Sequence, residues 1–598
     1  MAVADYLAGL HTCLTGHSSI SQTPLEFLRN EARMERSSIW LLSAGGRNVD
    51  ILRSMRRAIE VEPAHLAALC GAHGSPLAKL AAGLAIDVFE HAPPAGKDGF
   101  LATNSLASFL LLLARAYSEI TNSPFPSSLE ELTERSTPGY SGREYLREKF
   151  GPILEREHWL VLYDPGCRPI ATDLESRFSE AALGSIKLAD IRNFAHGRHH
   201  WIAKRSSTSA VVILSQPGTQ NIANKSLQLL PPSIPRTHIS FSCDPILAPI
   251  AGIMLSMEIA DWAGKTRGID PGKPGVPEFG RRFYNLTTKP RGDSELASEQ
   301  FVRRKARLTT KSLRGSTVGE VWDKALHRFC DELGRNSIRA IVFDYDGTLV
   351  DVQHRFEPPK QDVSLALVEL LSAGVRIGIA TGRGKSVRRD LQKVIPKEFW
   401  PHILIGYYNG AELGRLHEDG VPDSAKAQEP VIVAALELLN RHAAIRKHIR
   451  LDESHSQISV QWESTILGWK LLDLLDPVLH ALRQLGINVV SSGHSIDLLA
   501  PGVSKLRVVS KLSRDECIPL EEILAIGDRG RAPGNDAELL SHGPALSVDE
   551  VSDDPSTCWR LTPPMLKGTG ATIWYLSRLS ARKRVSGSVF FKKGALKA

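Results

Sequence analysis

The sequence predicts an α/β protein built on parallel sheets. Five short apolar runs each end in polar or glycine-containing residues: 39–42, 159–163, 340–343, 377–380 and 523–526. A buried strand that leads through a short turn toward a helix is the repeating unit of parallel sheets. Open sheets of this kind place their ligand sites beyond the carboxyl ends of the strands. The residues directly after these runs are therefore the candidate site residues.

The first run, Ile-Trp-Leu-Leu at 39–42, ends in a Ser/Gly loop, and a helical period begins near Ile51. Backbone N–H groups and the helix dipole make such a junction a ready phosphate site. The loop resembles the phosphosugar-binding loop of sugar isomerase (SIS) domains, and residues 74–78 and 97–105 resemble the next turns of that fold. The family's second serine and its threonine are here Gly45 and Asn48. The resemblance implies a sugar-phosphate site at Ser43, Gly45, Gly46, Arg47 and Asn48.

A second SIS-like copy is predicted from the run Trp-Leu-Val-Leu-Tyr at 159–163. Double-SIS isomerases use a helix glutamate and a later His-Gly pair for ring opening and proton transfer. The resemblance places these groups at Glu180, near the opening of a helix, and at His196. A surface glutamate and a structural histidine are the alternative. The residue that matches the isomerase lysine is Arg282, which stays protonated and cannot act as a base, so ligand binding is favoured over isomerisation.

Residues 1–150 and 151–288 are thus predicted to be two SIS-like subdomains. Residues 1–7 have a helical pattern where that fold usually opens with a strand, so either the strand is absent or the sequence begins at an internal start. The sheet would then expose an edge. Residues 289–335 carry many cations and few apolar side chains, among them Arg303, Arg304 and Lys305. We expect a solvated basic linker there. A nucleic-acid patch is less favoured because no aromatic residues interleave with the cations.

The run at 340–343 is followed by Asp344-Tyr345-Asp346-Gly347-Thr348. Of two carboxylates at a strand end, one can attack as a nucleophile while the other moves protons, with a hard cation held between them. A strand that runs into an acidic turn is the plain alternative. Thr381 ends the next run, where its hydroxyl can bind a phosphate oxygen. Lys505 lies near a helix start, and Asp528 and Asp536 follow the last run.

In this order the segments resemble the four motifs of the haloacid dehalogenase-like (HAD) hydrolases, which are mostly Mg-dependent phosphatases. The resemblance implies that Asp344 is the nucleophile and Asp346 the general acid/base. Thr381 and Lys505 would then hold the phosphoryl group, and Mg²⁺ would be bound by Asp344, Asp346 through its backbone carbonyl, Asp528 and Asp536. In relatives the two acidic pairs usually sit close together, whereas residues 529–534 separate them here. Asp536 therefore needs that loop to fold inward.

Residues 336–410 and 500–580 are predicted to form the hydrolase core, with a cap at 411–499. Tyr-Asn-Gly-Ala at 408–411 resembles the start of the cap in the Cof, trehalose-phosphatase and sucrose-phosphatase branch, which acts on phosphorylated sugars and other small phosphometabolites. The pattern predicts an α+β cap, with His455 and Trp462 more suited to packing than to binding. Its expected helices are 431–442 and 467–485, and its expected strands are 458–462, 487–490 and 496–499. The basic tail, 581–598, is predicted to be disordered.

Composition fits a multidomain enzyme. The chain has 598 residues, 42% apolar and 23% charged, with a net charge of +7. Seven scattered cysteines without a CxxC pattern suggest a reducing, cytoplasmic location. No apolar run approaches the roughly 20 residues of a membrane span. We expect a phosphorylated small-molecule substrate and a possible homodimer through the SIS-like half, and neither membrane nor nucleic acid as a partner.

The predicted function is a Mg-dependent phosphatase that acts on a small phosphorylated metabolite, either a sugar phosphate or a nucleotide-like compound. Its SIS-like half would bind a sugar phosphate. Two alternatives remain: a bifunctional sugar-phosphate isomerase and phosphatase, and a ligand-sensing protein whose first half controls the second.

Overall fold

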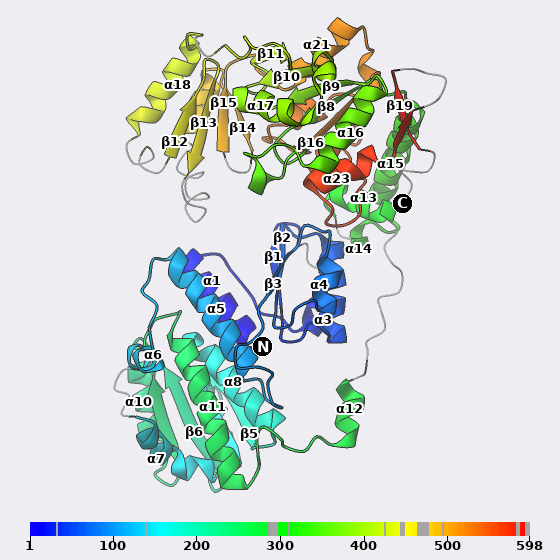
Figure 1. Cartoon of the computed structure of the whole chain (residues 1–598). Helices are drawn as coiled ribbons and strands as arrows, with labels where there is room; N and C mark the ends of the chain where they lie inside the picture. Colours follow the sequence, from blue (N-terminus) through cyan, green and yellow to red (C-terminus); the bar gives the residue numbers. More distant parts are fainter. Residues whose placement is uncertain are drawn as a thin grey trace. The chain divides into compact units, whose positions relative to one another are not determined.

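The protein is described by a computed structural model. It covers the chain except residues 31–33, 138–141, 285, 287–296, 309, 424–425, 443–445, 447–448, 463–475, 477, 493–494, 582–586 and 593–598. The chain divides into two compact units, and the main boundary between them in the sequence lies between residues 289 and 290. Each unit is an α/β structure with parallel strands, and each is described by itself (Figure 1).

The first unit begins with a three-stranded parallel sheet of order β1-β2-β3. Its helix α1 (Ala2–Thr15) starts at the second residue of the chain, so the helical pattern expected there is confirmed. Strand β1 lies at one edge of this sheet. The other elements are β1 (Ser38–Ser43), α3 (Val49–Val61), β2 (His65–Cys70), α4 (Pro76–Ala81), β3 (Asp87–Glu90) and α5 (Asn104–Ile120).

The second sheet of this unit has four parallel strands in the order β5-β4-β6-β7. Helices α8 (Arg168–Glu180) and α11 (Ala248–Arg267) pack on one face (Figure 1). The other face carries the shorter α9 (His199–Lys204) and α10 (Gln220–Leu229). The strands are β4 (His158–Tyr163), β5 (Ser185–Asp190), β6 (Ser209–Ser215) and β7 (Arg236–Ser240). The parallel α/β class is confirmed for this half, and its SIS identity stays a prediction.

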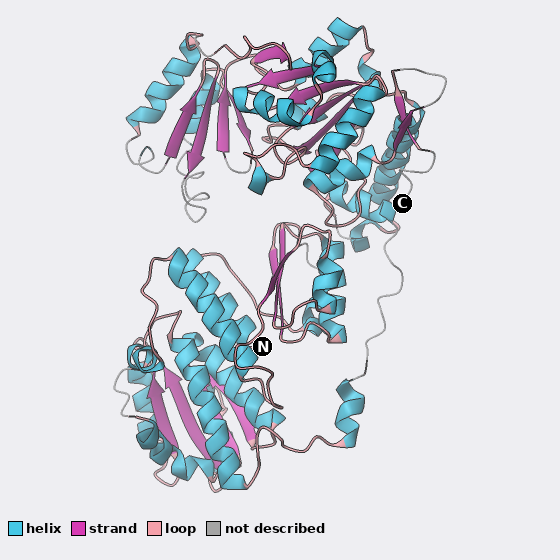
Figure 2. Ribbon diagram, viewed as in Figure 1, coloured by secondary structure: helices cyan, strands magenta, loops and turns pink. Residues whose placement is uncertain are grey.

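The core of the second unit is a six-stranded sheet of order β11-β10-β9-β8-β16-β17, antiparallel only at β11 (Figure 2). The chain moves outward from β8 to β11 on one side and from β16 to β17 on the other. The carboxyl ends of β8 and β16 therefore flank the point where the strand order reverses. The strands are β8 (Ala340–Asp344), β9 (Arg376–Ala380), β10 (Ile403–Tyr407), β11 (Glu412–Arg415), β16 (Ile523–Arg529) and β17 (Ala545–Glu550).

Helices cover both faces of the six-stranded sheet, as the buried apolar runs require. Side chains of α21 and α22 pack with Val342 and Ala525, while those of the other helices pack with Ile341 and Phe343. The helices are α16 (Gln361–Ser372), α17 (Lys385–Val394), α21 (Leu506–Glu516), α22 (Ala537–Leu540) and α23 (Gly568–Leu576).

The cap is an antiparallel sheet of order β12-β13-β15-β14 with helix α18 (Pro430–Arg441). Three of its strands were predicted, namely β13 (Gln457–Trp462), β14 (Asn488–Ser491) and β15 (Ser495–Leu499). Strand β12 (Ile449–Glu453) was not predicted. The expected helix 467–485 lies mostly outside the described residues. The predicted cap boundary at 411 is wrong, because β11 pairs with β10 in the core sheet.

The expected basic linker is wrong for residues 297–335. This segment forms α13 (Ala297–Ala306), α14 (Thr310–Leu313) and α15 (Thr317–Arg335), and its apolar side chains join the hydrophobic core of the six-stranded sheet. Lys305 is buried, and its Nζ donates to Thr557 O at 2.6 Å, Cys558 O at 3.0 Å and Ser552 Oγ at 3.1 Å. Main-chain carbonyls replace water as the hydrogen-bond partners of the Lys305 ammonium group. The number of charged residues in the segment does not predict this burial.

The expected disordered tail is also wrong in part. Strands β18 (Leu579–Ala581) and β19 (Val589–Phe591) form an antiparallel pair, and Val589 also pairs with Ile338 next to β8. The apolar triplet of β19 is buried, which anchors this part of the basic segment.

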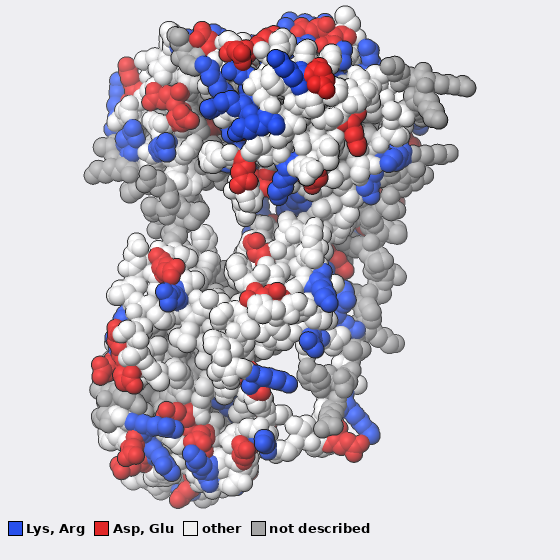
Figure 3. All heavy atoms as spheres, viewed as in Figure 1, with Lys and Arg blue, Asp and Glu red and all other residues white. Residues whose placement is uncertain are grey.

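The surface carries both signs of charge on each unit, on the face drawn in Figure 3. Lys and Arg gather over α17, whose sequence contains Lys385, Arg388, Arg389 and Lys393. Among the described residues, no helix is both long and apolar enough to cross a membrane.

Candidate active site

Asp344 is the last residue of β8 and lies at the strand end with almost no exposed surface. Thr348 Oγ1 donates to its Oδ2 at 3.0 Å, and Lys505 Nζ donates to its Oδ1 at 2.6 Å. Burial and the charge of Asp536 raise the pKa of Asp344 to about 7, against the opposing effect of Lys505. The carboxylate is thus fixed in orientation from both of its oxygens. The contact from Thr348 was not predicted, although Gly347-Thr348 belongs to the motif that begins at Asp344.

Gly347 makes the acidic turn possible. Its φ is +85°, a conformation that side chains rarely adopt, and a Cβ there would collide with the carboxylate of Asp528. The turn and the acid from β16 therefore approach each other only because this position has no side chain.

Lys505 precedes helix α21 and is fully buried. Its Nζ lies 2.6 Å from Asp344 Oδ1 and 2.7 Å from Asp536 Oδ1. Burial alone would lower the pKa of this lysine, but the two carboxylates hold it far above its usual value. Lys505 is therefore a permanent cation in the centre of the site.

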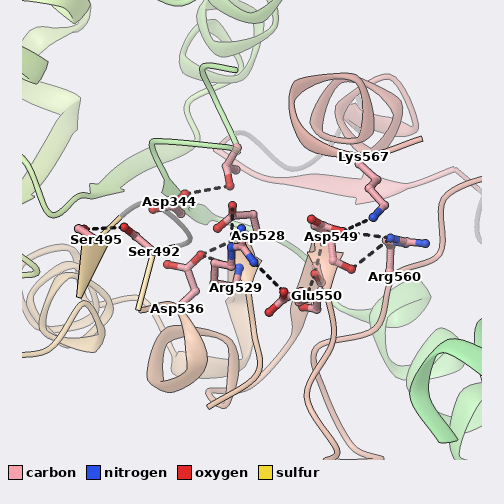
Figure 4. Close-up of polar contacts among 12 residues, drawn as sticks. Asp344, Ser492, Ser495, Asp528, Arg529, Asp536, Asp549, Glu550, Arg560 and Lys567 are labelled. Carbon is pink, nitrogen blue, oxygen red and sulfur yellow. Dashed lines mark hydrogen bonds and ion pairs between the residues drawn. The ribbon is translucent and has the colours of Figure 1, made fainter. Parts of the chain in front are cut away.

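Asp528 and Asp536 complete an acidic cluster with Asp344. Asp536 Oδ2 accepts from the backbone N–H of Asp528 at 2.9 Å and of Arg529 at 3.1 Å, so the intervening loop folds inward. One carboxylate oxygen from each of the three acids lies within 4.8 Å of the others. Figure 4 shows the three converging from β8, β16 and the start of α22.

The electrostatics of the cluster fit a hard divalent cation. Burial and the neighbouring charge of Asp344 raise the pKa of Asp528. Burial would also raise the pKa of Asp536, but Lys505 lowers it. Lys505 contacts Asp344 and Asp536, while Asp528 lies 3.7 Å from Arg529 Nε. Arg529 is also paired with Glu550, so negative charge is in excess. Carboxylate oxygens are the ligands that Mg²⁺ prefers, and the residues present therefore fit that ion.

Asp346 faces a different partner. Its Oδ1 lies 3.5 Å from Arg383 Nη1, and its side chain is not one of the three clustered carboxylates. Burial raises the pKa of Asp346, against the opposing charge of Arg383. Arg383 is held in turn by Ser386 Oγ at 3.0 Å and by Asp390 at 3.4 Å. The role of Arg383 was not predicted, although it follows Thr381-Gly382 in the second motif.

Thr381 directly follows β9 and is fully buried. Its Oγ1 accepts from the backbone N–H of Arg383 at 3.0 Å. The same hydroxyl therefore shapes the turn that presents Arg383, and its hydrogen has no acceptor within the described part of the chain.

Residues 341–454 match the model of the haloacid dehalogenase-like hydrolase family. The chain contains a haloacid dehalogenase-like hydrolase domain. No curated protein matches the chain.

Several solved structures resemble the chain weakly. One is a phosphatase of the haloalkanoate enzyme superfamily from Bacteroides thetaiotaomicron, at 20% identity over 36% of this chain and 85% of that chain, with a TM-score of 0.26. Another is IMP-nucleotidase from Plasmodium falciparum, at 14% identity over 46% and 82%, with a TM-score of 0.32. A third is glucosamine-6-phosphate deaminase from Thermotoga maritima, at 14% identity over 46% and 86%, with a TM-score of 0.35. At these TM-scores the likenesses say nothing about activity.

The hydrolase domain and its cap enclose a cavity of about 400 Å³ above the acidic cluster. Asn409 Nδ2 donates to Gln457 Oε1 at 3.0 Å and to Asp497 Oδ2 at 3.2 Å, and these contacts tie the cap to the hinge at 408–410. Neither His455 nor Trp462 lines the cavity, as expected from the sequence. The cap residues that line this cavity were not predicted from the sequence. They are Arg450, Asp452, Glu453, Ser454, Gln457, Ser459, Gln461, Ser492, Ser495 and Asp497.

The predicted sugar-phosphate loop of the first unit has the expected strand-loop-helix form. Ser43 Oγ accepts from Gly46 N–H at 3.0 Å, and Asn48 Oδ1 caps α3 by accepting from Asp50 N–H at 2.8 Å. Gly45 and Arg47 are exposed. The side chains of Ser43 and Asn48 thus also stabilise the conformation of the loop.

The structure places Glu180 and His196 at opposite ends of their strands. Helix α8 opens at Arg168, just after the carboxyl end of β4, and Glu180 is its last residue. Thirteen helical residues span about 20 Å, so Glu180 lies near the amino ends of the strands, whereas His196 follows the carboxyl end of β5. Both side chains are exposed, and Glu180 accepts from Ser176 Oγ at 2.5 Å.

Arg282 lies on the short helix α12 (Glu278–Tyr284) and is exposed. Its Nη2 is 3.4 Å from Glu278 Oε1, one turn away on the same helix. The structure therefore brings together the predicted hydrolase residues, whereas Glu180, His196 and Arg282 are exposed and lie on separate elements.

Proposed function

We propose that the hydrolase domain is a Mg²⁺-dependent phosphatase that works through an aspartyl-phosphate on Asp344. The observation that carries the proposal is the position of Asp344: a buried carboxylate at a strand end, fixed by Lys505 and Thr348, within 4.8 Å of two further acids. Phosphoryl transfer needs such positioning and charge neutralisation more than it needs covalent activation.

In the first step, an oxygen of Asp344 attacks phosphorus, and the bond from phosphorus to the leaving oxygen breaks. Asp346 gives its proton to that leaving oxygen, a role that suits a carboxyl whose pKa burial has raised. In the second step, Asp346 takes a proton from water, whose oxygen attacks phosphorus and releases Asp344 and inorganic phosphate. Atoms and charge balance over the two steps.

Cationic and hydroxyl groups support these steps. Lys505 neutralises the nucleophile and the transferred group, while Thr381 donates to a phosphoryl oxygen. Arg383 orients Asp346. Asp344, Asp528, Asp536 and the backbone carbonyl of Asp346 would hold Mg²⁺, which supplies further neutralisation of phosphoryl charge.

The substrate that we propose is a small phosphorylated metabolite rich in hydroxyl groups, such as a sugar phosphate or a nucleotide-like compound. The cavity of about 400 Å³ is of a size for such a molecule. Its cap side carries amide, hydroxyl and carboxylate groups, including Gln457, Ser459 and Asp452, which suit hydrogen bonds to a polyol.

A phosphate-release screen over phosphorylated metabolites, with and without Mg²⁺, tests the proposal. We expect release that needs Mg²⁺ and that disappears in the Asp344→Asn variant. Release by a pure, folded Asp344→Asn protein at the wild-type rate would contradict the assignment of the nucleophile.

For the first unit we infer a ligand-binding role and not isomerase chemistry. The support is the separation of Glu180 from His196 and the replacement of the expected lysine by Arg282. A sugar phosphate at loop 43–48 would then act as a ligand that alters the kinetics of phosphate release. Conversion of fructose-6-phosphate to an isomer without phosphate release would contradict this inference.

A further inference from the structure

A second cavity, of about 530 Å³, lies in the first unit on one face of the β4–β7 sheet. The register of β4 with β5 places Leu160, Leu162, Lys187 and Ala189 on this face. The opposite face is covered by α8 and α11, of 13 and 20 residues, whereas this face carries α10, of 10 residues, and α9, of only 6. The sheet is therefore left partly open beside its edge strand β5.

The floor of this cavity is apolar and its rim is cationic. Leu160, Leu162, Leu188 and Phe194 supply apolar surface. Four cations line it as well: Lys187, Arg198, Lys204 and Arg205. No Asp or Glu is among its lining residues, and within the described part of the chain none of the four cations has a carboxylate partner.

Trp201 adds a donor without an acceptor. The indole ring lines the cavity, with Lys187 Nζ 3.0 Å and the Arg205 guanidinium 5.6 Å from its centre. Its Nε1 is buried and has no hydrogen-bond partner among the described residues. A buried N–H without an acceptor costs about 1–3 kcal/mol, so a ligand would be favoured that draws this N–H toward the cavity and accepts from it.

We propose that this cavity binds a small organic anion with a ring-sized apolar body. The body would lie on the leucines and Phe194, and the carboxylate, sulfonate or phosphate group would meet the cations of α9 and its flanking residues. The cavity volume falls in the usual range for small-molecule sites, about 300–1,000 Å³. The site is separate from loop 43–48 and does not depend on the proposed phosphatase activity.

The test measures binding of two probes to the full-length protein by calorimetry. Anilinonaphthalene sulfonate carries the anion, and N-phenylnaphthylamine has the same apolar body without it. We expect the sulfonate to bind about tenfold more tightly than the neutral amine, as one charge-assisted contact implies. Equal binding of the two probes, or binding of neither, would overturn the proposal.

Two variants locate the site. Arg198→Glu should weaken sulfonate binding about tenfold or more, and Trp201→Phe, which removes the N–H and keeps a ring, should weaken it severalfold. Arg192→Glu is the matched control, because Arg192 is exposed in the same loop but does not line the cavity. Equal losses in Arg198→Glu and Arg192→Glu would show attraction to the general surface and reject the site. Circular dichroism and thermal unfolding establish that each variant is folded.

Discussion

Lys505 lies between two carboxylates, 2.6 Å from Asp344 and 2.7 Å from Asp536, with almost no exposed surface. A buried ion pair rarely adds much to stability, because both groups lose their water. The third carboxylate, Asp528, lies 3.7 Å from Arg529, which is itself paired with Glu550. Burial raises the pKa of Asp344 and of Asp528, so it disfavours charged carboxylates that lack a cation. The arrangement makes sense as a site for a second cation and for an anionic phosphoryl group.

Replacing Asp344 by Asn should abolish phosphate release, with a loss of at least about 10⁴-fold, because an amide is a poor nucleophile. The variant should remain folded, since Asn keeps the shape and removes one of three like charges. Initial rates and thermal unfolding, measured on the same sample, check both expectations. A smaller loss with an intact fold would assign the nucleophile elsewhere.

Mg²⁺ should stabilise the protein by mass action, by about 2.7 kcal/mol when its concentration is 100 times its Kd. Asp528→Asn should remove most of this stabilisation and raise the Mg²⁺ concentration needed for half-maximal activity. Thermal unfolding at several Mg²⁺ concentrations measures the first effect. Asp419→Asn serves as the control, because Asp419 is an exposed acid far from the cluster in sequence. Equal behaviour of the two variants would argue against Asp528 as a ligand.

At the scale of elements, the helices α13–α15 form part of the hydrophobic core, although their sequence is rich in cations. Phe301, Phe329 and Leu333 pack into the hydrolase core, and Lys305 donates to two main-chain carbonyls of residues 557 and 558. Burial lowers the pKa of Lys305 to about 8, so near neutral pH the ammonium still donates to its acceptors. The helical layer thus holds the segment that follows β17 in place.

Lys305→Ala should lower the free energy of unfolding by about 2 kcal/mol, because buried carbonyls lose their donor. Urea unfolding of the full-length protein measures the change. Lys324→Ala, an exposed lysine of α15, should change stability by less than about 0.5 kcal/mol. If the two variants were equally stable, the buried contacts of Lys305 would be energetically neutral.

At the scale of the whole molecule, the two compact units meet in the sequence near residue 289, and the hydrolase unit includes α13–α15. A fragment of residues 290–598 should therefore fold and release phosphate at a rate close to that of the full chain. A fragment that starts at residue 336 should be unstable or insoluble, because it exposes the core surface that α13–α15 cover. Circular dichroism, solubility and phosphate release compare the two, and equal stability would contradict the structural role of these helices.

The sequence by itself predicted the α/β class and five charged positions of the candidate hydrolase site, Asp344, Asp346, Lys505, Asp528 and Asp536. It also predicted the strands β1, β4, β8, β9, β13, β14, β15 and β16. These signals are local: an apolar run predicts a buried strand, and parallel strands bring the polar residues at their ends to one edge. The turn at Gly347 and the helix at the N-terminus were likewise readable from nearby residues.

Only the tertiary structure decided which distant groups meet. It paired Asp346 with Arg383 and tied Asn409 to Asp497. It also buried Lys305 of the basic segment and placed Glu180 and His196 at opposite ends of strand β5. Each of these outcomes depends on acceptors or charges far away along the chain. A cationic side chain can be buried only where the fold supplies carbonyl groups that accept its hydrogen bonds. The sequence around the cation does not show whether such carbonyls will be nearby.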